Sequence, residues 1–337
     1  MTDERETIEV ADIRELAIEA CIACGASLPV TSSLVQATLS AALFGNEALG
    51  FPHFLDYLES FRSGRIDGQA EPYIEHPLPA IILSDAQGGI AQLGFDLAFG
   101  RLVEHTKSLG VALFTQRNSY TAGELGYYVR RLALNGLVSV AATNGPAVMA
   151  AAAGSPRVYC TNPLAFGAPA SPPASPLIID QATSATAFVN IVRAAARNEP
   201  IPEGWATDSQ GGATTDASAA LQGALLPFGG YKGANLALLV EVLSAGLSGS
   251  SWSVDANDFR SGHQSPGIGF TVIAVSPTAI SKDFSERCAA HMARLRDLGV
   301  HIPGSKAGAA AQDAPPVVSI DRSVLDAIRT YVGPRVD

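Results

Sequence analysis

Apolar side chains recur every three to four positions through the first 65 residues of the chain. This spacing puts them on one face of a helix, so it predicts helices rather than strands. Gly25 and Gly64 follow two of these runs, as expected of residues that end helices, and Thr31 or Ser32 suits the start of another. The predicted helices span residues 8–22, 32–46 and 52–63.

The pattern changes after a polar, proline-rich connector at residues 65–80. Short runs rich in Val, Ile, Leu and Phe then alternate with helical stretches, which predicts strands interspersed with helices. A long irregular loop is expected at 196–224. The predicted strands span residues 80–85, 111–116, 136–143, 157–160, 176–180 and 268–275, and the later helices span 93–109, 123–134, 233–246, 281–298 and 321–331.

The chain has 337 residues, of which 47% are hydrophobic and 16% charged, and its net charge is −10. This composition suits a compact enzyme, and the negative charge argues against nucleic acid or an anionic membrane as main partner. A small anionic substrate is still compatible, because an acidic chain can carry a local basic pocket. The charged first residues and the absence of a long apolar run favour a cytoplasmic protein. Cys21 and Cys24 lie within a helical pattern without further ligands, so no metal site is predicted.

Lys232 follows a pair of glycines and begins an apolar run with helical spacing, in the stretch GGYKGANLALL. Free N–H groups at a helix start and the helix dipole both favour an anion there. The spacing is not that of a phosphate-binding loop, and no Gly-x-Gly-x-x-Gly fingerprint follows a strand. The alternative interpretation is an exposed lysine on an ordinary helix.

Two loops and a turn carry further candidate ligand contacts. TNPLAFGAP at 161–169 is stiffened by two prolines, and DQATSA begins at Asp180, where a strand is predicted to end. Asp180 either caps the next helix or holds a substrate or cofactor hydroxyl. Pro303, Gly304 and Ser305 form a turn that offers free N–H groups. Local sequence leaves a structural turn and a ligand contact both open.

Taken in order, TNPLAFGAP, DQATSA, IPEGWATD, GGYKG and the final Pro-Gly turn resemble the malate/L-lactate dehydrogenase family that lacks a Rossmann fold. The resemblance covers nearly the whole chain. It implies an α+β fold, with a mostly antiparallel central sheet in a non-Rossmann NAD(P)-binding domain and a helical domain formed by both chain ends. Residues 1–75, completed by 281–337, would form the helical domain, and residues 76–280 the NAD(P)-binding and substrate domain.

The resemblance also implies the chemistry. Family members are homodimers that use NADH or NADPH, and their substrates are 2-oxo acids, 2-hydroxy acids or cyclic ketimine carboxylates. The implied cofactor-binding residues are Asp180, Gln181, Ala182, Thr183, Lys232, Pro303, Gly304 and Ser305.

Two histidines typical of the family are missing from their places. The Ser-His-Gly-x-x-Arg motif falls on residues 48–53, so Leu49 replaces the acid–base histidine and His53 occupies the arginine position. Thr121 replaces a second histidine, in the stretch from Asn118 to Gly123. His53 lies four residues after Leu49 and thus on the same helical face, so one explanation is a shifted acid that enters the same pocket.

A changed substrate is a second explanation. A ketone needs a positioned proton donor, which contributes roughly 10²–10⁴-fold, whereas a protonated imine already carries its positive charge. The loss of both histidines therefore favours reduction of a cyclic ketimine carboxylate, of the Δ1-pyrroline-2-carboxylate or Δ1-piperideine-2-carboxylate type. The alternatives are a 2-oxo acid or L-2-hydroxy acid dehydrogenase, and a non-redox lyase, scaffold or regulatory protein. The candidate catalytic residues are His53, Thr121 and Tyr120, and the candidate substrate-binding residues are Arg117 and Asn144.

Overall fold

The computed structural model describes residues 5–44, 46–304 and 317–332. Its centre is a seven-stranded sheet in the order β2-β3-β4-β12-β5-β8-β9, in which β3 and β4 form the parallel pair and the other five neighbouring pairs are antiparallel. This arrangement confirms the predicted α+β fold with a mostly antiparallel central sheet. The strands are β2 (Tyr73–Leu78), β3 (Ile81–Asp85), β4 (Val111–Ser119), β5 (Val138–Thr143), β8 (Leu164–Ala168), β9 (Leu177–Gln181) and β12 (Ile268–Val275).

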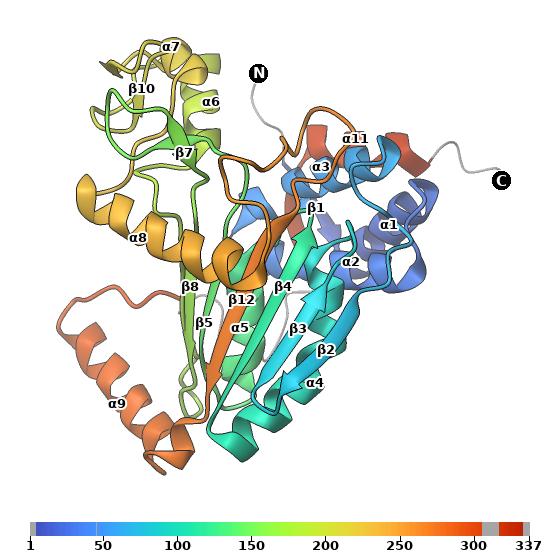
Figure 1. Ribbon diagram of the computed structural model, residues 1–337, viewed down its shortest axis with the longest axis vertical. Helices are drawn as coiled ribbons and strands as arrows, with labels where there is room; N and C mark the ends of the chain where they lie inside the picture. The colour runs from blue at the N-terminus through green and yellow to red at the C-terminus, as the bar shows by residue number, and fades with distance from the viewer. Residues whose placement is uncertain (1–4, 45, 305–316, 333–337) are drawn as a thin grey trace.

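Helices cover this sheet unequally. In Figure 1, α4 (Ala91–Leu109) and α5 (Leu125–Leu134) lie behind the strands, while α8 (Tyr231–Glu241) crosses in front of their upper ends. Large apolar residues on the α4 and α5 side form one core, in which the rings of Phe95, Tyr128 and Phe270 pack edge-to-face or tilted. Successive residues of a strand point to opposite faces, so this core takes every second side chain.

A helical unit contains both ends of the described chain. Its helices are α1 (Val10–Ala23), α2 (Leu28–Leu43), α3 (Phe51–Arg62) and α11 (Arg322–Val332). They share one core, and the antiparallel pair β1 (Arg5–Glu9) and β13 (Val317–Asp321) joins the two ends. Tyr120 inserts into this core from the loop after β4. The helical unit therefore packs directly against the segment that carries Thr121.

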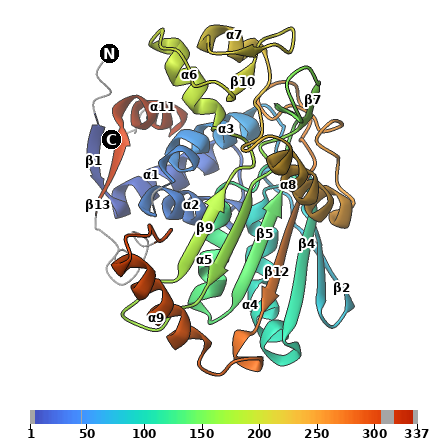
Figure 2. The same ribbon diagram turned by 90° about the vertical axis from the view of Figure 1, so that its left-hand side faces the viewer.

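The helix α9 (Phe284–Asp297) buries none of its residues and lies toward the opposite end of the sheet from α3 and α11 (Figure 1 and Figure 2). Its first turn attaches to the loop after β8, where Ser171 N donates to the Ser285 carbonyl. Of the C-terminal region, residues 317–332 thus pack with the helical unit and residues 284–297 do not. The division into 1–75 with 281–337, and 76–280, stays a proposal.

A small lobe stands above α8 in Figure 1. A separate apolar cluster stabilises it, with Met149, Ile191 and Leu225 buried at its centre. Its elements are β6 (Met149–Ala150), β7 (Arg157–Tyr159), α6 (Phe188–Ala196), β10 (Ala206–Thr207), β11 (Ala213–Thr214) and α7 (Ala217–Gln222). The short helices elsewhere are η1 (Glu47–Leu49), the π-helical η2 (Val242–Gly246) and η3 (Pro277–Ala279).

Several local predictions were wrong. β2 lies in the expected connector, and β8 lies in the expected TNPLAFGAP loop. Neither strand was predicted, because a mostly exposed edge strand and a strand of small residues both lack a strong apolar pattern. The helix α2 begins earlier than expected, with Ser27 rather than Thr31 or Ser32 as its cap. Ser27 Oγ accepts from Val30 N at 3.5 Å, and Pro29 fits the first turn. Within the described part of the chain, no helix has the length and apolar character needed to cross a membrane.

Candidate active site

His53 lies in the first turn of α3 and is held from both sides of its ring. Its Nδ1 lies 2.9 Å from Oδ2 of Asp56, and its Nε2 lies 3.1 Å from Oγ1 of Thr121. Asp56 is three residues further along the same helix, whereas Thr121 comes from a loop 68 positions away. Folding therefore makes neighbours of two candidate catalytic residues, His53 and Thr121.

The hydrogen-bonded chain continues beyond Thr121. Its Oγ1 donates to the Tyr57 hydroxyl at 2.7 Å, and that hydroxyl donates to the Thr121 carbonyl at 3.1 Å. Gln92 Nε2 also donates to the Tyr57 hydroxyl, at 3.0 Å. Both ring nitrogens of His53 are therefore occupied by protein groups, the Asp56 carboxylate on one side and the Thr121 hydroxyl on the other.

The charges around His53 follow from its neighbours. Burial raises the pKa of Asp56, but the hydrogen bond and charge of His53, together with the charge of Arg260, outweigh it and lower this pKa overall. Burial raises the pKa of Tyr57 to about 12, although Thr121 and Gln92 oppose the shift. Near neutral pH the cluster therefore combines an ionised Asp56 with a neutral phenol.

Tyr120, the third candidate catalytic residue, lies inside the core of the helical unit with no exposed surface. Its hydroxyl accepts from Ser60 Oγ and donates to the Phe259 carbonyl, both at 2.8 Å. Burial raises the pKa of this phenol far above its usual value. The geometry therefore favours a packing role for Tyr120 over the catalytic role predicted from sequence.

The two candidate substrate-binding residues are both engaged elsewhere. Arg117 Nε lies 2.9 Å from Oδ2 of Asp85, a neighbour on the adjacent strand β3. Asn144 is buried, donates to the Ser251 carbonyl at 2.9 Å and accepts from Gly269 N at 2.9 Å. Asn144 thus links the segment after η2 to β12, and the geometry favours a bridging role for it. Arg117 keeps a half-exposed side chain, but its guanidinium is tied to Asp85.

The segments expected to bind the cofactor meet around β9. The amide and the hydroxyl of Thr183 both donate to the Thr161 carbonyl at 2.8 Å, and Phe228 N donates to the Thr183 carbonyl at 3.0 Å. The TNP, DQATS and GGYKG stretches are therefore adjacent. Thr183 is buried and its hydroxyl is used in this contact, whereas Gln181 is exposed and Ala182 partly so.

The Pro303–Gly304 turn lies against the same strand. A Cβ built on Gly304, whose φ is +79°, would come within 2.8 Å of Ile178 N in β9. This close approach explains why glycine stands there. Ser305, the last residue of the predicted turn, lies outside the described residues. The geometry thus gathers four distant stretches of sequence at one sheet edge.

The start of α8 has the properties of an anion site. Gly229 and Gly230 have φ values of +57° and +63°, and a Cβ built on either would meet no atom within 4 Å. The helix has no side-chain cap at its first turn, and Lys232 is exposed there. Free N–H groups, the helix dipole and a cation facing open space fit the diphosphate of a dinucleotide.

Asp180 points away from that turn, toward α5. Its Oδ2 accepts from Gly126 N at 2.8 Å, at the start of α5, on the face of β9 that also carries the core residue Ile178. Burial, and then the charge of Glu124, raise the Asp180 pKa to about 7, against the opposing effects of Gly126 N and Arg130. Asp180 therefore caps a helix, which was one of the two roles predicted for it. The helix that it caps is α5, which precedes Asp180 in the chain, and not the helix that follows it.

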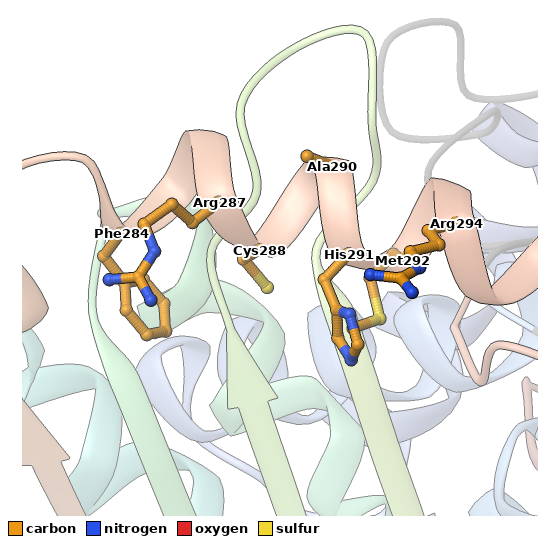
Figure 3. A pocket seen from close by; sticks show the side chains of 7 residues that line it. All are labelled: Phe284, Arg287, Cys288, Ala290, His291, Met292 and Arg294. Carbon is orange, nitrogen blue, oxygen red and sulfur yellow. The ribbon is translucent and has the colours of Figure 1, made fainter.

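A groove with a volume of about 660 Å³ lies elsewhere, beneath α9. Figure 3 shows Phe284, Cys288, His291 and Met292 extending from the helix toward the strands below. It contains none of the predicted site residues. No cluster of three potential metal ligands occurs among the described residues. The His53 cluster and the segments around β9 therefore form the candidate site.

Sequence reasoning missed Asp56, Tyr57 and Gln92. Asp56 and Tyr57 follow His53 by three and four positions, a spacing that places side chains together on a helix, so this signal was available. Gln92 was not foreseeable, because its partners Tyr57 and the Ala122 carbonyl belong to other elements. Its Oε1 is buried without a hydrogen-bond partner among the described residues.

Comparison with known proteins places this geometry in context. The sequence profile of the malate/L-lactate dehydrogenase family matches residues 8–329. A (2R)-3-sulfolactate dehydrogenase (NADP(+)) from Chromohalobacter salexigens is 33% identical over 331 residues, which cover 98% of this chain and 99% of that protein. A Δ1-pyrroline-2-carboxylate reductase from Pseudomonas fluorescens is 36% identical over 286 residues, covering 83% of this chain and 85% of that protein.

Solved structures show the same similarity. The crystal structure of Δ1-piperideine-2-carboxylate reductase from Pseudomonas syringae pv. tomato matches with a TM-score of 0.89 at 30% sequence identity. The match covers 97% of this chain and 99% of that one.

Proposed function

Because the chain belongs to the malate/L-lactate dehydrogenase family, we propose that it is an NAD(P)H-dependent reductase of a small cyclic ketimine carboxylate, of the Δ1-pyrroline-2-carboxylate or Δ1-piperideine-2-carboxylate type. Relatives and a structural neighbour named for these substrates support the proposal. The observation in this chain that carries it is the state of His53, whose two ring nitrogens are both occupied by protein groups.

Reduction of a ketone develops an alkoxide that must take a proton, so a proton donor aimed at the substrate oxygen accelerates the reaction. Leu49 supplies no proton, and His53 directs its nitrogens to Asp56 and Thr121. A protonated cyclic imine needs no such donor, since a hydride added to its carbon sends the C=N electron pair to nitrogen and leaves a neutral amine. The site as built is therefore better suited to an iminium substrate.

The cofactor in this proposal is NADPH or NADH, which would supply the hydride. Lys232 and the free amides at the start of α8 would hold its phosphates, and the exposed Gln181 and the Pro303–Gly304 turn lie along the same edge. The name of the sulfolactate relative specifies NADP(+). The choice between the two cofactors is part of the experiment below.

Steady-state assays test which substrate class the protein reduces. NADPH and NADH oxidation should be followed at 340 nm with Δ1-pyrroline-2-carboxylate, Δ1-piperideine-2-carboxylate, pyruvate, oxaloacetate and 3-sulfopyruvate. We expect kcat/KM for at least one cyclic imine to exceed that for every keto acid by tenfold or more. Equal or greater turnover of a keto acid would overturn the proposal in favour of a 2-oxo acid or L-2-hydroxy acid dehydrogenase, an alternative favoured by the sulfolactate dehydrogenase relative.

The non-redox alternative, a lyase, scaffold or regulatory protein, predicts no nicotinamide binding. Thermal melting with millimolar NADPH or NADH distinguishes it, because a ligand that binds only the folded chain raises the melting temperature. Absence of a shift with both cofactors would favour this alternative.

We also propose that the protein is a cytoplasmic homodimer. Large apolar side chains stay exposed along α8, η2 and the residue after η2, and exposed apolar surface of this kind is typical of an interface. Their exposed fractions are 72% for Tyr231, 49% for Leu238, 46% for Leu239, 48% for Val242 and 50% for Leu247. All four cysteines are free thiols, which suits a reducing compartment. Light scattering should give twice the 34.8 kDa chain mass, and cell fractionation tests the compartment.

A further inference from the structure

The loop that leads into β12 reaches across to α3 and is attached there at several points. The Phe259 carbonyl accepts from the Tyr120 hydroxyl at 2.8 Å, and the Gly262 carbonyl accepts from Arg65 Nη1 at 3.1 Å. His263 Nδ1 lies 3.2 Å from the Ser63 carbonyl. In Figure 1 this loop, coloured orange, passes beside α3. These contacts hold residues 259–263 close to the helix that carries His53.

Arg260 lies in the middle of this loop with a side chain that is 60% exposed. Its Nε is 3.5 Å from Oδ1 of Asp56, whose other oxygen holds His53 Nδ1. Its guanidinium carbon lies 5.1 Å from the centre of the Phe259 ring. The ion pair and the ring contact fix the direction of the side chain. Both terminal nitrogens of Arg260 lack a hydrogen-bond partner among the described residues. Arg260 therefore keeps free N–H donors and is linked to His53 through Asp56.

Three other cations that could bind an anion differ from Arg260 in their surroundings. Arg65 is buried, and its guanidinium donates to Ser60 Oγ and to the Gly262 carbonyl. Arg117 also pairs through Nε alone, but its partner is Asp85 on β3, which is not part of the His53 cluster. Lys232 lies at the start of α8, in the part of the site assigned to the cofactor phosphates. Among the described residues, Arg260 is therefore the half-exposed guanidinium that pairs with Asp56, the carboxylate that holds His53.

We propose that Arg260 binds the carboxylate of the substrate and selects anionic substrates over neutral ones. This inference rests on the proposed ketimine carboxylate reductase activity. A guanidinium presents paired N–H donors that match the two oxygens of a carboxylate. Asp56 holds one edge of the Arg260 guanidinium, and the substrate carboxylate takes the free nitrogens. The attachment of residues 259–263 to α3 and Tyr120 keeps Arg260 beside the His53 cluster.

The variants Arg260→Ala and Arg260→Lys test the proposal by kinetics. Hydrogen bonds to charged groups contribute about 1.5–3 kcal/mol, so KM for Δ1-pyrroline-2-carboxylate should rise about 10–100-fold in R260A and partly recover in R260K. KM for the nicotinamide cofactor should change less than threefold. Arg329→Ala is the matched control, because Arg329 is also a half-exposed arginine paired with carboxylates, on α11. Unchanged KM for the imine in R260A would overturn the inference.

Binding of two non-reactive probes separates this inference from the proposed activity. Calorimetry with NADP(+) present compares pyrrole-2-carboxylate with pyrrole-2-carboxamide, its neutral analogue. The wild-type protein should bind the carboxylate at least tenfold more tightly, and R260A should lose that preference. If the wild type reduces imines but R260A keeps the preference, the role of Arg260 is wrong and the activity stands. If the wild type reduces no imine but the preference depends on Arg260, the activity is wrong and the anion site stands.

Discussion

The buried carboxyl of Asp180 makes the stability of the protein depend on pH. Burial and the charge of Glu124 raise its pKa from 3.8 to about 7 in the folded chain. Below about pH 4 both the folded and the unfolded chain hold this proton. Between pH 4 and 7 the unfolded chain releases it while the folded chain keeps it, so the free energy of unfolding falls as the pH rises. Above pH 7 the loss is complete.

The size of this effect follows from the shift. About three pKa units at about 1.4 kcal/mol each correspond to about 4 kcal/mol between pH 4 and 8. A chain of 337 residues unfolds with an entropy of about 0.7 kcal/mol/K, at roughly 2.1 cal/mol/K per residue. The Asp180 contribution to the melting temperature should therefore fall by about 6 °C across this range.

The substitution Asp180→Asn isolates this contribution. Asparagine keeps an oxygen that can accept from Gly126 N, but it does not titrate. Differential scanning fluorimetry at intervals from pH 4 to 8 should show the melting temperature of D180N rising relative to the wild type, by about 6 °C over the range. Parallel profiles for the two proteins would refute the raised pKa and its assignment to burial.

Asp85→Asn is the control of opposite sign. Burial raises the pKa of Asp85, but hydrogen bonds from Asn118, Gln87 N and Arg117 and the charge of Arg117 outweigh it and lower the pKa overall. An ionised Asp85 therefore stabilises the folded chain at neutral pH, and this contribution is lost as the pH falls through its folded pKa. D85N should be less stable than the wild type at pH 7 and approach it at acid pH, the reverse of D180N.

Three further outcomes are expected. Thr121→Val removes the hydroxyl between His53 and the Tyr57 phenol but keeps the side-chain shape. We expect kcat/KM for the imine to fall about tenfold and the cofactor affinity to stay unchanged. An unaltered kcat/KM would show that Thr121 is not part of the site. Lys232→Ala should weaken NADPH binding about 3–10-fold in a fluorescence titration, with a smaller effect at high salt, and equal affinity would contradict the phosphate contact. Gly233→Ala places a Cβ against the Phe228 carbonyl and should lower the melting temperature by several degrees, whereas the control Gly100→Ala, where a Cβ meets no atom within 4 Å, should raise it by about 1 °C.

The sequence alone determined the helices of the N-terminal unit and most strands of the sheet, because apolar spacing reports directly which face of an element is buried. It also located the Lys232 turn, since paired glycines before an apolar helical run have a local physical meaning. The fold class followed from a resemblance carried by short motifs in a specific order. Each periodic run and each motif is contained within a short stretch of consecutive residues.

Only the tertiary structure decided how the polar side chains are used. Strand alternation and the position of α5 turned Asp180 toward a helix start, so its local pattern could not tell a helix cap from a cofactor contact. One hydrogen-bond partner of Tyr120, Phe259, and one of Asn144, Ser251, lie more than a hundred residues away in the chain.

The meeting of His53 with Thr121 has the same origin. Their contact spans 68 residues and depends on how the helical unit packs against the end of β4. Side-chain hydrogen bonds between distant segments are set by packing, which leaves no periodic trace in the sequence. The sequence therefore specified which polar groups were available, and packing decided which of them hydrogen-bond to one another.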